Sequence, residues 1–214
     1  MISLTRRTLL LTASALAVAG TRPAFAQGAG APADSSMEAP LRELYAGLET
    51  VMKAGHATPF SKRFDTLEPV VDKVFDLETV LKVSVGMRWD TMPPDVQERL
   101  LKAFRRFTVA TYVANFDKYD GERFEVLAGS RESGTDRIVA SEIVGGGQKF
   151  RLDYVMRDGT GGWRVVDVLL DGSISRVAVQ RSDFRKILAG GDANALIASL
   201  KRKIVDLSDG ALSS

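Results

Sequence analysis

The residue best placed to do chemistry in this sequence is Asp167, the one carboxyl group in a largely apolar segment, residues 163–170. A buried carboxylate costs free energy unless it is paired or protonated, so its surroundings decide its role. In one interpretation Asp167 is a general acid or base in a cone-shaped cavity. In the other it is a structural carboxylate that an arginine or backbone amides hold. No second catalytic group lies at a telling spacing, which favours the structural interpretation.

Other residue types exclude much of the remaining enzymology. The chain has no cysteine, so disulfides, thiolate metal sites and cysteine nucleophiles are ruled out. Its single histidine, His56, lies in a turn-like stretch and cannot form a histidine-rich metal cluster. Residues 159–162 (Gly-Thr-Gly-Gly) lack the Lys-Ser/Thr ending of a phosphate loop and are typical of a hairpin turn. We therefore expect no catalytic residue, no metal site and no cofactor.

The first 26 residues have the features of a secretory signal peptide. Arg6 and Arg7 precede an uncharged run at 9–20, and residues 24–26 (Ala-Phe-Ala) supply the cleavage pattern. The run is shorter than the roughly 20 apolar residues that a membrane-spanning helix needs. Cleavage there predicts a periplasmic protein that starts at Gln27. The arginine pair also resembles a twin-arginine export motif, and Sec signals can carry two arginines as well, so both export routes stay open.

Removal of this leader changes the charge balance. The full chain has 29 basic and 27 acidic residues, and the leader holds three of the arginines and no acidic residue. A nearly neutral mature protein gives no general reason to expect nucleic acid as a partner. The basic runs at 105–106, 185–186 and 201–203 are typical of solvated helix faces. The alternative is that they contact anionic headgroups or an acidic partner.

Beyond the leader, the pattern predicts one domain. Residues 27–36 are small and polar and predict a flexible lead-in, residues 37–208 form the domain, and residues 209–214 form a tail. Up to about residue 118, apolar residues recur every three or four positions, which predicts helices. The expected helices cover 41–51, 60–74 and 77–85, followed by a long helix that starts after Pro93-Pro94.

From about residue 122 the apolar period changes to two, which is typical of strands. One strand begins at Phe124, and the others cover 136–143, 150–156 and 163–170 with glycine-rich turns at 145–147 and 159–162. Helices return at 181–189 and 192–206. We expect an α+β fold in which N-terminal and C-terminal helices and a curved antiparallel sheet of about four strands enclose an apolar cavity. If such a wedge does not close fully around its large aromatic residues, it holds a long apolar ligand.

Several blocks of the sequence resemble the toluene-tolerance family, the periplasmic phospholipid-binding proteins of the MlaC type. These blocks are residues 113–126 (VANFDKYDGERFEV), 152–157 (LDYVMR) and 162–168 (GWRVVDV), and they occur in the family's order. Residues 171–185 (DGSISRVAVQRSDFR) are most similar to its hopanoid-associated, HpnM-type branch. The likeness extends over roughly residues 40–206.

The resemblance implies a carrier that moves one lipid at a time, phospholipid or hopanoid, between the inner and outer membranes. The acyl chains would lie in the apolar cavity. The implied partners are an ABC transporter with an MCE-domain ring at the inner membrane, an outer-membrane lipoprotein complex and, transiently, the membrane surface. The resemblance and the apolar pattern together imply eleven lipid-binding residues: Trp89, Phe104, Thr108, Tyr112, Phe116, Phe150, Leu152, Tyr154, Trp163, Val165 and Leu169.

Two points of this interpretation carry alternatives. Arg88-Trp89 departs from the double-aromatic pattern usual at that point of the family, so the local pocket shape is open. The loops at 145–147 and 159–162 are candidate parts of a mobile lid. Two other function classes also stay open: a periplasmic enzyme that uses Asp167 as acid or base, and an interaction protein whose own side chains fill the cavity.

Overall fold

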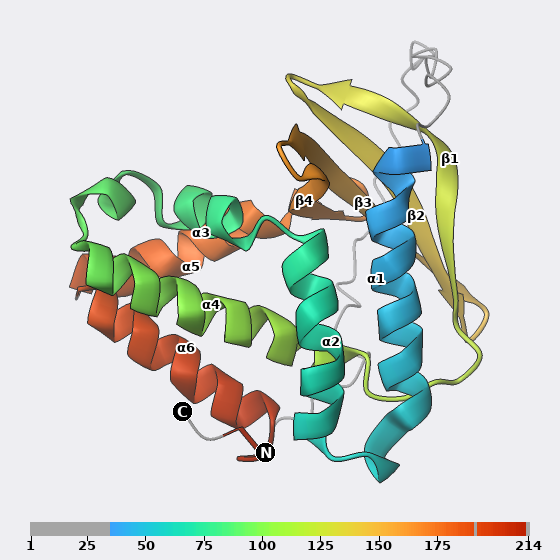
Figure 1. Ribbon diagram of the computed structural model, residues 1–214, viewed down its shortest axis with the longest axis horizontal. Coiled ribbons are helices and arrows are strands. Elements are labelled where there is room, and N and C mark those ends of the chain that lie inside the picture. The colour runs from blue at the N-terminus through green and yellow to red at the C-terminus, as the bar shows by residue number, and fades with distance from the viewer. Residues whose placement is uncertain (1–34, 191, 213–214) are drawn as a thin grey trace, which may run out of the picture.

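Helices make up the first half of the described chain (Figure 1). The structure is a computed structural model that describes residues 35–190 and 192–212, so the expected signal peptide lies outside the described residues. The elements of this half are α1 (Ser35–Ala54), η1 (Gly55–Ala57), α2 (Phe60–Val74), α3 (Leu77–Val85), η2 (Gly86–Thr91) and α4 (Pro94–Asn115). The four α-helices agree with those predicted from the apolar spacing. Helix α1 begins two residues before residue 37, the expected start of the domain.

The boundaries of α3 and α4 have local causes. Asp76 caps α3, because its Oδ1 accepts a hydrogen bond from the Thr79 backbone amide at 3.0 Å. Gly86 ends α3 with a φ of 71°, a left-handed conformation that glycine adopts without steric cost. Pro94 begins α4 at a position where a backbone N–H would have no helical partner.

The second half begins with an antiparallel sheet in which strands adjacent in sequence are adjacent in space. The strands are β1 (Arg123–Ser133), β2 (Asp136–Gly145), β3 (Gln148–Gly159), β4 (Gly162–Leu170) and β5 (Ile174–Ser175). The expected α+β class and antiparallel order are confirmed. The sheet has five strands where about four were expected, because β5 is only two residues long and leaves no periodic pattern in the sequence.

A bulge in β4 decides which side chains share a face of the sheet. Tyr154 pairs with Val168, but Met156 pairs with Val165, so one residue of β4 is skipped. Val165 and Val168 therefore lie on the same face as Tyr154, which we call the inner face. Leu169 pairs with Asp153 and lies on the opposite, outer face.

The last two helices, α5 (Arg176–Gly190) and α6 (Ala193–Leu207), pack against the first half of the chain. The sequence predicted the start of α5 at residue 181, and this is wrong by five residues. The Ser175 hydroxyl accepts a hydrogen bond from the Ala178 amide, and Asp167 accepts one from the Val177 amide. Because one of these capping groups lies on β4, the local sequence does not reveal the start of the helix.

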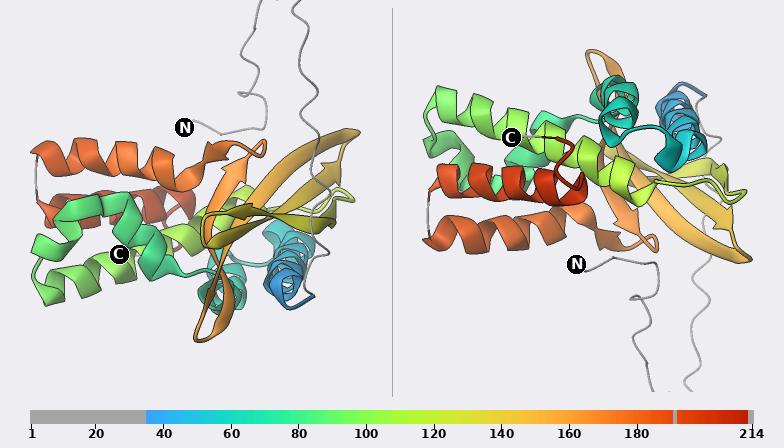
Figure 2. Two further views of the ribbon diagram at one scale, coloured as in Figure 1. Left: turned by 90° about the horizontal axis from the view of Figure 1, so that it is seen from above. Right: turned by 90° about the horizontal axis from the view of Figure 1, so that it is seen from below.

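One core joins the helices and the sheet. Helices α1 and α2 lie against the sheet, while α3, α4, α5 and α6 pack together beside it (Figures 1 and 2). The most buried large side chains come from both parts, for example Leu44 and Leu48 of α1, Phe104 of α4, Tyr154 of β3 and Leu200 of α6. Within residues 35–190 and 192–212, no helix is both long and apolar enough to cross a membrane.

Candidate functional site

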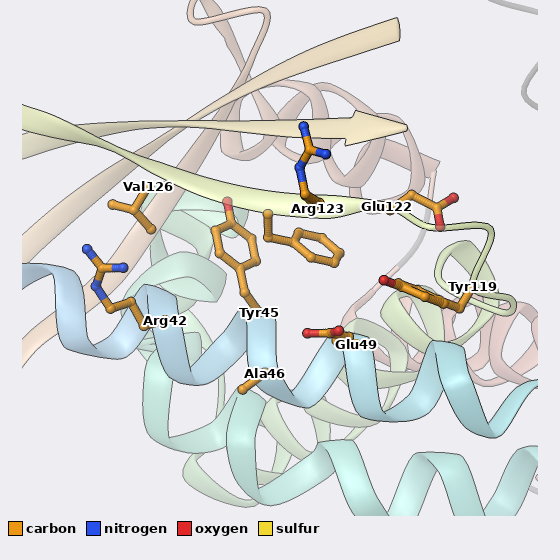
Figure 3. A pocket seen from close by; sticks show the side chains of 9 residues that line it. Arg42, Tyr45, Ala46, Glu49, Tyr119, Glu122, Arg123 and Val126 are labelled. Carbon is orange, nitrogen blue, oxygen red and sulfur yellow. The ribbon is translucent and has the colours of Figure 1, made fainter. Parts of the chain in front are cut away.

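A groove of about 420 Å³ runs between α1 and β1, the strand at one edge of the sheet (Figure 3). Arg42 and Val126 lie at one end of it, and Tyr119 and Glu122 lie at the other. The Tyr45 ring lies between α1 and β1 and forms the floor of the groove. The full lining is Arg42, Tyr45, Ala46, Glu49, Tyr119, Glu122, Arg123, Phe124 and Val126.

The floor of this groove is aromatic. The ring of Tyr45 on α1 stacks on that of Phe124 on β1, with 4.8 Å between centroids and 26° between planes. On its other side Tyr45 meets the edge of Tyr154 on β3, at 6.0 Å. Such offset and edge-to-face pairs stabilise a contact beyond the burial of their area. The groove therefore ends on a rigid apolar surface that α1 and the sheet build together.

This floor continues inward as a chain of rings. Phe124 is followed by Phe116 at 6.0 Å, then by Tyr112 at 6.1 Å and by Phe75 at 5.7 Å. The rings come from the end of α4 and from the residue after α2. We call the whole set the aromatic cluster: Tyr45, Phe75, Tyr112, Phe116, Phe124 and Tyr154.

The polar atoms of the cluster are neutral and partly paired. Ser141 donates its hydroxyl proton to the Leu152 carbonyl at 2.7 Å, so Tyr45 is the donor in the hydrogen bond between the Tyr45 and Ser141 hydroxyls. Burial raises the pKa of Tyr45, Tyr112 and Tyr154, so these phenols stay protonated. The interior next to the groove is therefore uncharged, and it suits an apolar ligand.

Charged side chains line the groove above this floor. Glu122 is the buried one, at 4% exposed, and it accepts a hydrogen bond from the Asp120 amide at 2.7 Å, whereas the charges on α1 are paired at the rim. Arg42 pairs with Glu38 at 2.5 Å, one helical turn away. Glu49 pairs with Lys53 at 2.6 Å in the same manner. Exposed pairs of this kind contribute little to stability and exchange readily with solvent. The rim can therefore face a polar group without a large desolvation cost.

Asp167, the candidate acid or base, is held on the outer face. Its Oδ1 accepts hydrogen bonds from the amides of Val168 at 2.7 Å and Val177 at 3.0 Å, and its Oδ2 accepts one from the Ser175 hydroxyl. It pairs across the sheet with Val155, so it points away from the aromatic cluster. Its geometry is that of a structural carboxylate that fixes the start of α5. Within residues 35–190 and 192–212, no group of three His, Cys, Asp or Glu residues is placed to hold a metal ion.

Three of the eleven residues implied for lipid binding belong to the aromatic cluster: Tyr112, Phe116 and Tyr154. Three more lie on the inner face of the sheet, namely Leu152, Trp163 and Val165. Val165 is the central one of these, because its carbonyl accepts a hydrogen bond from the Asp76 amide at 2.9 Å next to Phe75. The structure brings these six residues to one side of the sheet.

Phe150 lies on the same inner face, two residues before Leu152, but near the start of β3, where it is 46% exposed. The other four lie elsewhere. Phe104 of α4 packs against Phe184 of α5, and Thr108 bonds back to the Phe104 carbonyl. Trp89 is buried in η2. Leu169, as noted, is on the outer face because of the bulge.

Three members of the cluster were missed by sequence reasoning. Tyr45 follows Leu44 in the apolar stripe of α1, Phe75 follows the last residue of α2, and Phe124 is the second residue of β1. At its own position, each of the three residues is typical of an apolar core residue. The packing of α1 onto the edge of the sheet brings Tyr45 to Phe124, and the corner after α2 brings Phe75 to Tyr112. No local signal predicts either contact.

Comparison with known proteins shows which family has this fold. The family model described as MlaC protein matches residues 44–202, which include most of α1, all five strands and most of α6. The chain belongs to the MlaC family. None of the curated protein sequences compared with the chain matches it significantly.

A solved structure shares the fold of this MlaC-family chain. It is the phospholipid-binding protein from Ralstonia solanacearum in complex with a phospholipid, with a TM-score of 0.69 and 18% sequence identity. The match covers 83% of this chain and 99% of that one. The family match spans the aromatic cluster and the whole groove lining except Arg42. MlaC membership points to a binding protein rather than an enzyme, which agrees with the placement of Asp167.

Proposed function

We propose that this MlaC-family protein is a periplasmic carrier that binds a phospholipid and moves it between membranes. The observation that carries the proposal is the uncharged aromatic cluster beneath the α1–β1 groove. The fold likeness to a protein in complex with a phospholipid supports it, and so does the periplasmic location of the family.

The physics of lipid transfer explains why such an interior is needed. Each methylene kept out of water is worth about 0.8 kcal/mol, so a sixteen-carbon chain is worth roughly 13 kcal/mol. A carrier must offer comparable apolar surface. It must also bind little more tightly than a bilayer does, or it cannot release its cargo. An interior with few polar contacts, such as the aromatic cluster, meets both conditions.

In this proposal the groove is the entrance. The acyl chains pass beside Tyr45 and lie along the inner face, against Tyr112, Phe116, Leu152, Tyr154, Trp163 and Val165. The headgroup stays at the rim, near Arg42 and Glu49. Uptake requires α1 to separate from the sheet, because Tyr45 is only 5% exposed and its ring closes the way inward.

Native mass spectrometry of residues 27–214, purified from a periplasm without detergent, tests the proposal. We expect a bound species whose released mass and fragments identify a phospholipid. A folded protein that stays empty after incubation with phospholipid vesicles would contradict the carrier function. The intact mass of protein secreted from the full gene also tests cleavage after Ala26.

The same experiment addresses finer features that the sequence resemblance implies. We propose that the protein belongs to the HpnM-type branch, and a hopanoid mass among the released ligands would support this. We also propose exchange of cargo with an ABC transporter that carries an MCE-domain ring and with an outer-membrane lipoprotein complex. Cross-linking of the loaded protein in the periplasm, followed by identification of the adducts, tests both partners.

A further inference from the structure

The basic residues of this protein are concentrated on three helices. Helices α4, α5 and α6 together contain 11 basic and 4 acidic residues. The remaining residues from 27 onward contain 15 basic and 23 acidic ones. A protein that is nearly neutral as a whole therefore carries a net positive charge on α4, α5 and α6. This part of the molecule attracts anionic surfaces.

Two of these helices present one continuous face. Helices α4 and α6 lie side by side in both views (Figures 1 and 2). Arg99 donates to the Asn194 side-chain oxygen at 3.0 Å, and further along both helices the Lys203 ammonium lies 5.7 Å from the centre of the Phe107 ring. From the first contact to the second, the residue numbers rise along both helices, so the two helices run parallel.

Four exposed cations line this face. Arg99, Lys102 and Arg106 share one side of α4 because they are three and seven positions apart. On α6, Asn194 shares a side with Ala198 and Lys201, so the contact of Arg99 with Asn194 joins the two sides. Arg106 is half-buried, and its guanidinium packs 5.5 Å from the centre of the Phe64 ring on α2, so we define the basic strip as Arg99, Lys102, Lys201 and Arg202.

The strip keeps an excess of positive charge. Among residues 35–190 and 192–212, Lys102, Lys201 and Arg202 are exposed and form no ion pair. The Arg99 guanidinium forms an ion pair with the Asp95 carboxylate at 3.4 Å, and both side chains are more than half exposed. A shallow groove of about 370 Å³ on α6 adds Asp206 to the strip, together with the small apolar side chains of Ala198 and Val205. Glu98, also exposed, lies four residues before Lys102 on the same side of α4. Four cations therefore face three carboxylates, Asp95, Glu98 and Asp206.

We propose that the basic strip binds the surface of an anionic phospholipid bilayer. Protein interfaces depend on buried aromatic and arginine anchors seated in pockets, and the α6 groove is lined by no aromatic side chain. An anionic bilayer needs no such anchor, because each Lys or Arg near its surface strengthens binding by about fivefold. Two parallel helices with cations along one side match a flat, uniformly charged partner.

Contact through the strip leaves the cargo site uncovered. The basic strip lies on α4 and α6, whereas the α1–β1 groove is at the other end of the molecule (Figure 1). The proposal goes beyond the proposed carrier function and does not require it. In a carrier, the strip would hold the protein at a membrane while the groove stays open to a partner.

Sedimentation with vesicles tests the proposal. The vesicles contain phosphatidylglycerol and phosphatidylcholine in equal parts, with pure phosphatidylcholine as the comparison. The test variant is Lys201→Glu/Arg202→Glu on α6. The matched control is Arg185→Glu/Lys186→Glu, an exposed basic pair on α5 outside the strip, with the same change in net charge. Circular dichroism establishes that both variants are folded.

We expect the wild-type protein to bind the anionic vesicles, less so as salt is added, and not the pure phosphatidylcholine ones. The α6 variant should bind at least about 25-fold more weakly, and the α5 control within about threefold of the wild type. Equal loss in both variants, no loss in the α6 variant, or no binding by the wild type would each overturn the proposal. Retained phospholipid, measured separately by native mass spectrometry, reports on the carrier function alone.

Discussion

Tyr45 is the residue at which the groove and the buried cluster meet. Its ring forms the floor of the groove and packs against Phe124 and Tyr154, while its hydroxyl reaches Ser141 on the sheet. One side chain thus provides both apolar contact and a directional link between α1 and β2. The two contributions are separable, because phenylalanine keeps the ring and loses only the hydroxyl.

We expect Tyr45→Phe to lower the free energy of unfolding by about 1 kcal/mol. The loss is no larger because Ser141 still donates to the Leu152 carbonyl, so no buried donor is orphaned. Urea denaturation measures the effect, and Tyr119→Phe, a more exposed tyrosine of the same groove, is the control with no expected change. Equal stability of the Tyr45→Phe variant and the wild type would show that the hydroxyl link contributes nothing. Lipid retention should not change in either variant.

Tyr112 tests the apolar character of the cluster directly. Tyr112→Glu places an ionisable carboxyl group between Phe75 and Phe116, where bound acyl chains would make its charged form costly. We expect retained phospholipid to fall by at least about tenfold, on the order of the cost of burying one polar group. Tyr112→Phe should retain as much as the wild type. A folded Tyr112→Glu protein with undiminished lipid would show that the chains do not pass this residue.

At the scale of elements, the corner between α2 and α3 links the helices to the centre of the sheet. The Asp76 amide donates to the Val165 carbonyl of β4, and the Asp76 carboxylate caps α3. Burial alone would raise the pKa of Asp76, but hydrogen bonds from Thr79 and the charges of Arg164 and Arg157 lower it below its ordinary value. The cap is therefore strongest in its charged form.

We expect Asp76→Ala to lower the free energy of unfolding by about 1 kcal/mol at neutral pH. Because the pKa is lower in the folded than in the unfolded protein, the carboxylate stabilises the fold fully above its ordinary pKa of 3.8. This stabilisation is lost as the pH falls through the lower folded value. Denaturation of both proteins at several pH values measures it, and the difference between them should shrink toward acid pH. A difference that does not depend on pH would mean that the charge of Asp76 is not what caps α3.

Elements with local signals could be predicted from the sequence, and those fixed by distant contacts could not. The prolines before α4 and the glycine after α3 mark helix ends in the chain itself. The start of α5 depends on Asp167 of another element, and the bulge that turns Leu169 outward depends on pairing with β3. Tyr112 and Tyr154 were named as candidate site residues because their positions resemble those of the family, whereas Tyr45 joins them only through the packing of α1 on the sheet.

At the scale of the whole molecule, the proposed cargo is larger than the open space. Protein interiors are close-packed, and Tyr154, Phe104 and Leu44 are each at most 1% exposed. The α1–β1 groove holds about 420 Å³, within the range of small-molecule pockets rather than two long acyl chains. Uptake of a phospholipid must therefore separate whole elements. The boundary with the fewest covalent constraints is that between α1 and the sheet, because α1 is the first element of the domain.

The absence of cysteine makes this separation measurable. Ala46→Cys on α1 and Phe150→Cys on β3 give two labelling sites without removal of any native thiol, and Phe150 is 46% exposed. Spin labels at both sites report the distance between α1 and the sheet. We expect this distance to increase by several ångströms when lipid-free protein is loaded from phospholipid vesicles, because close-packed layers leave no room for an acyl chain between them. A second pair, Lys102→Cys and Arg185→Cys on α4 and α5, should keep its distance, since those helices pack away from the groove. A constant distance in the first pair with lipid demonstrably bound would place the cargo elsewhere than between α1 and the sheet.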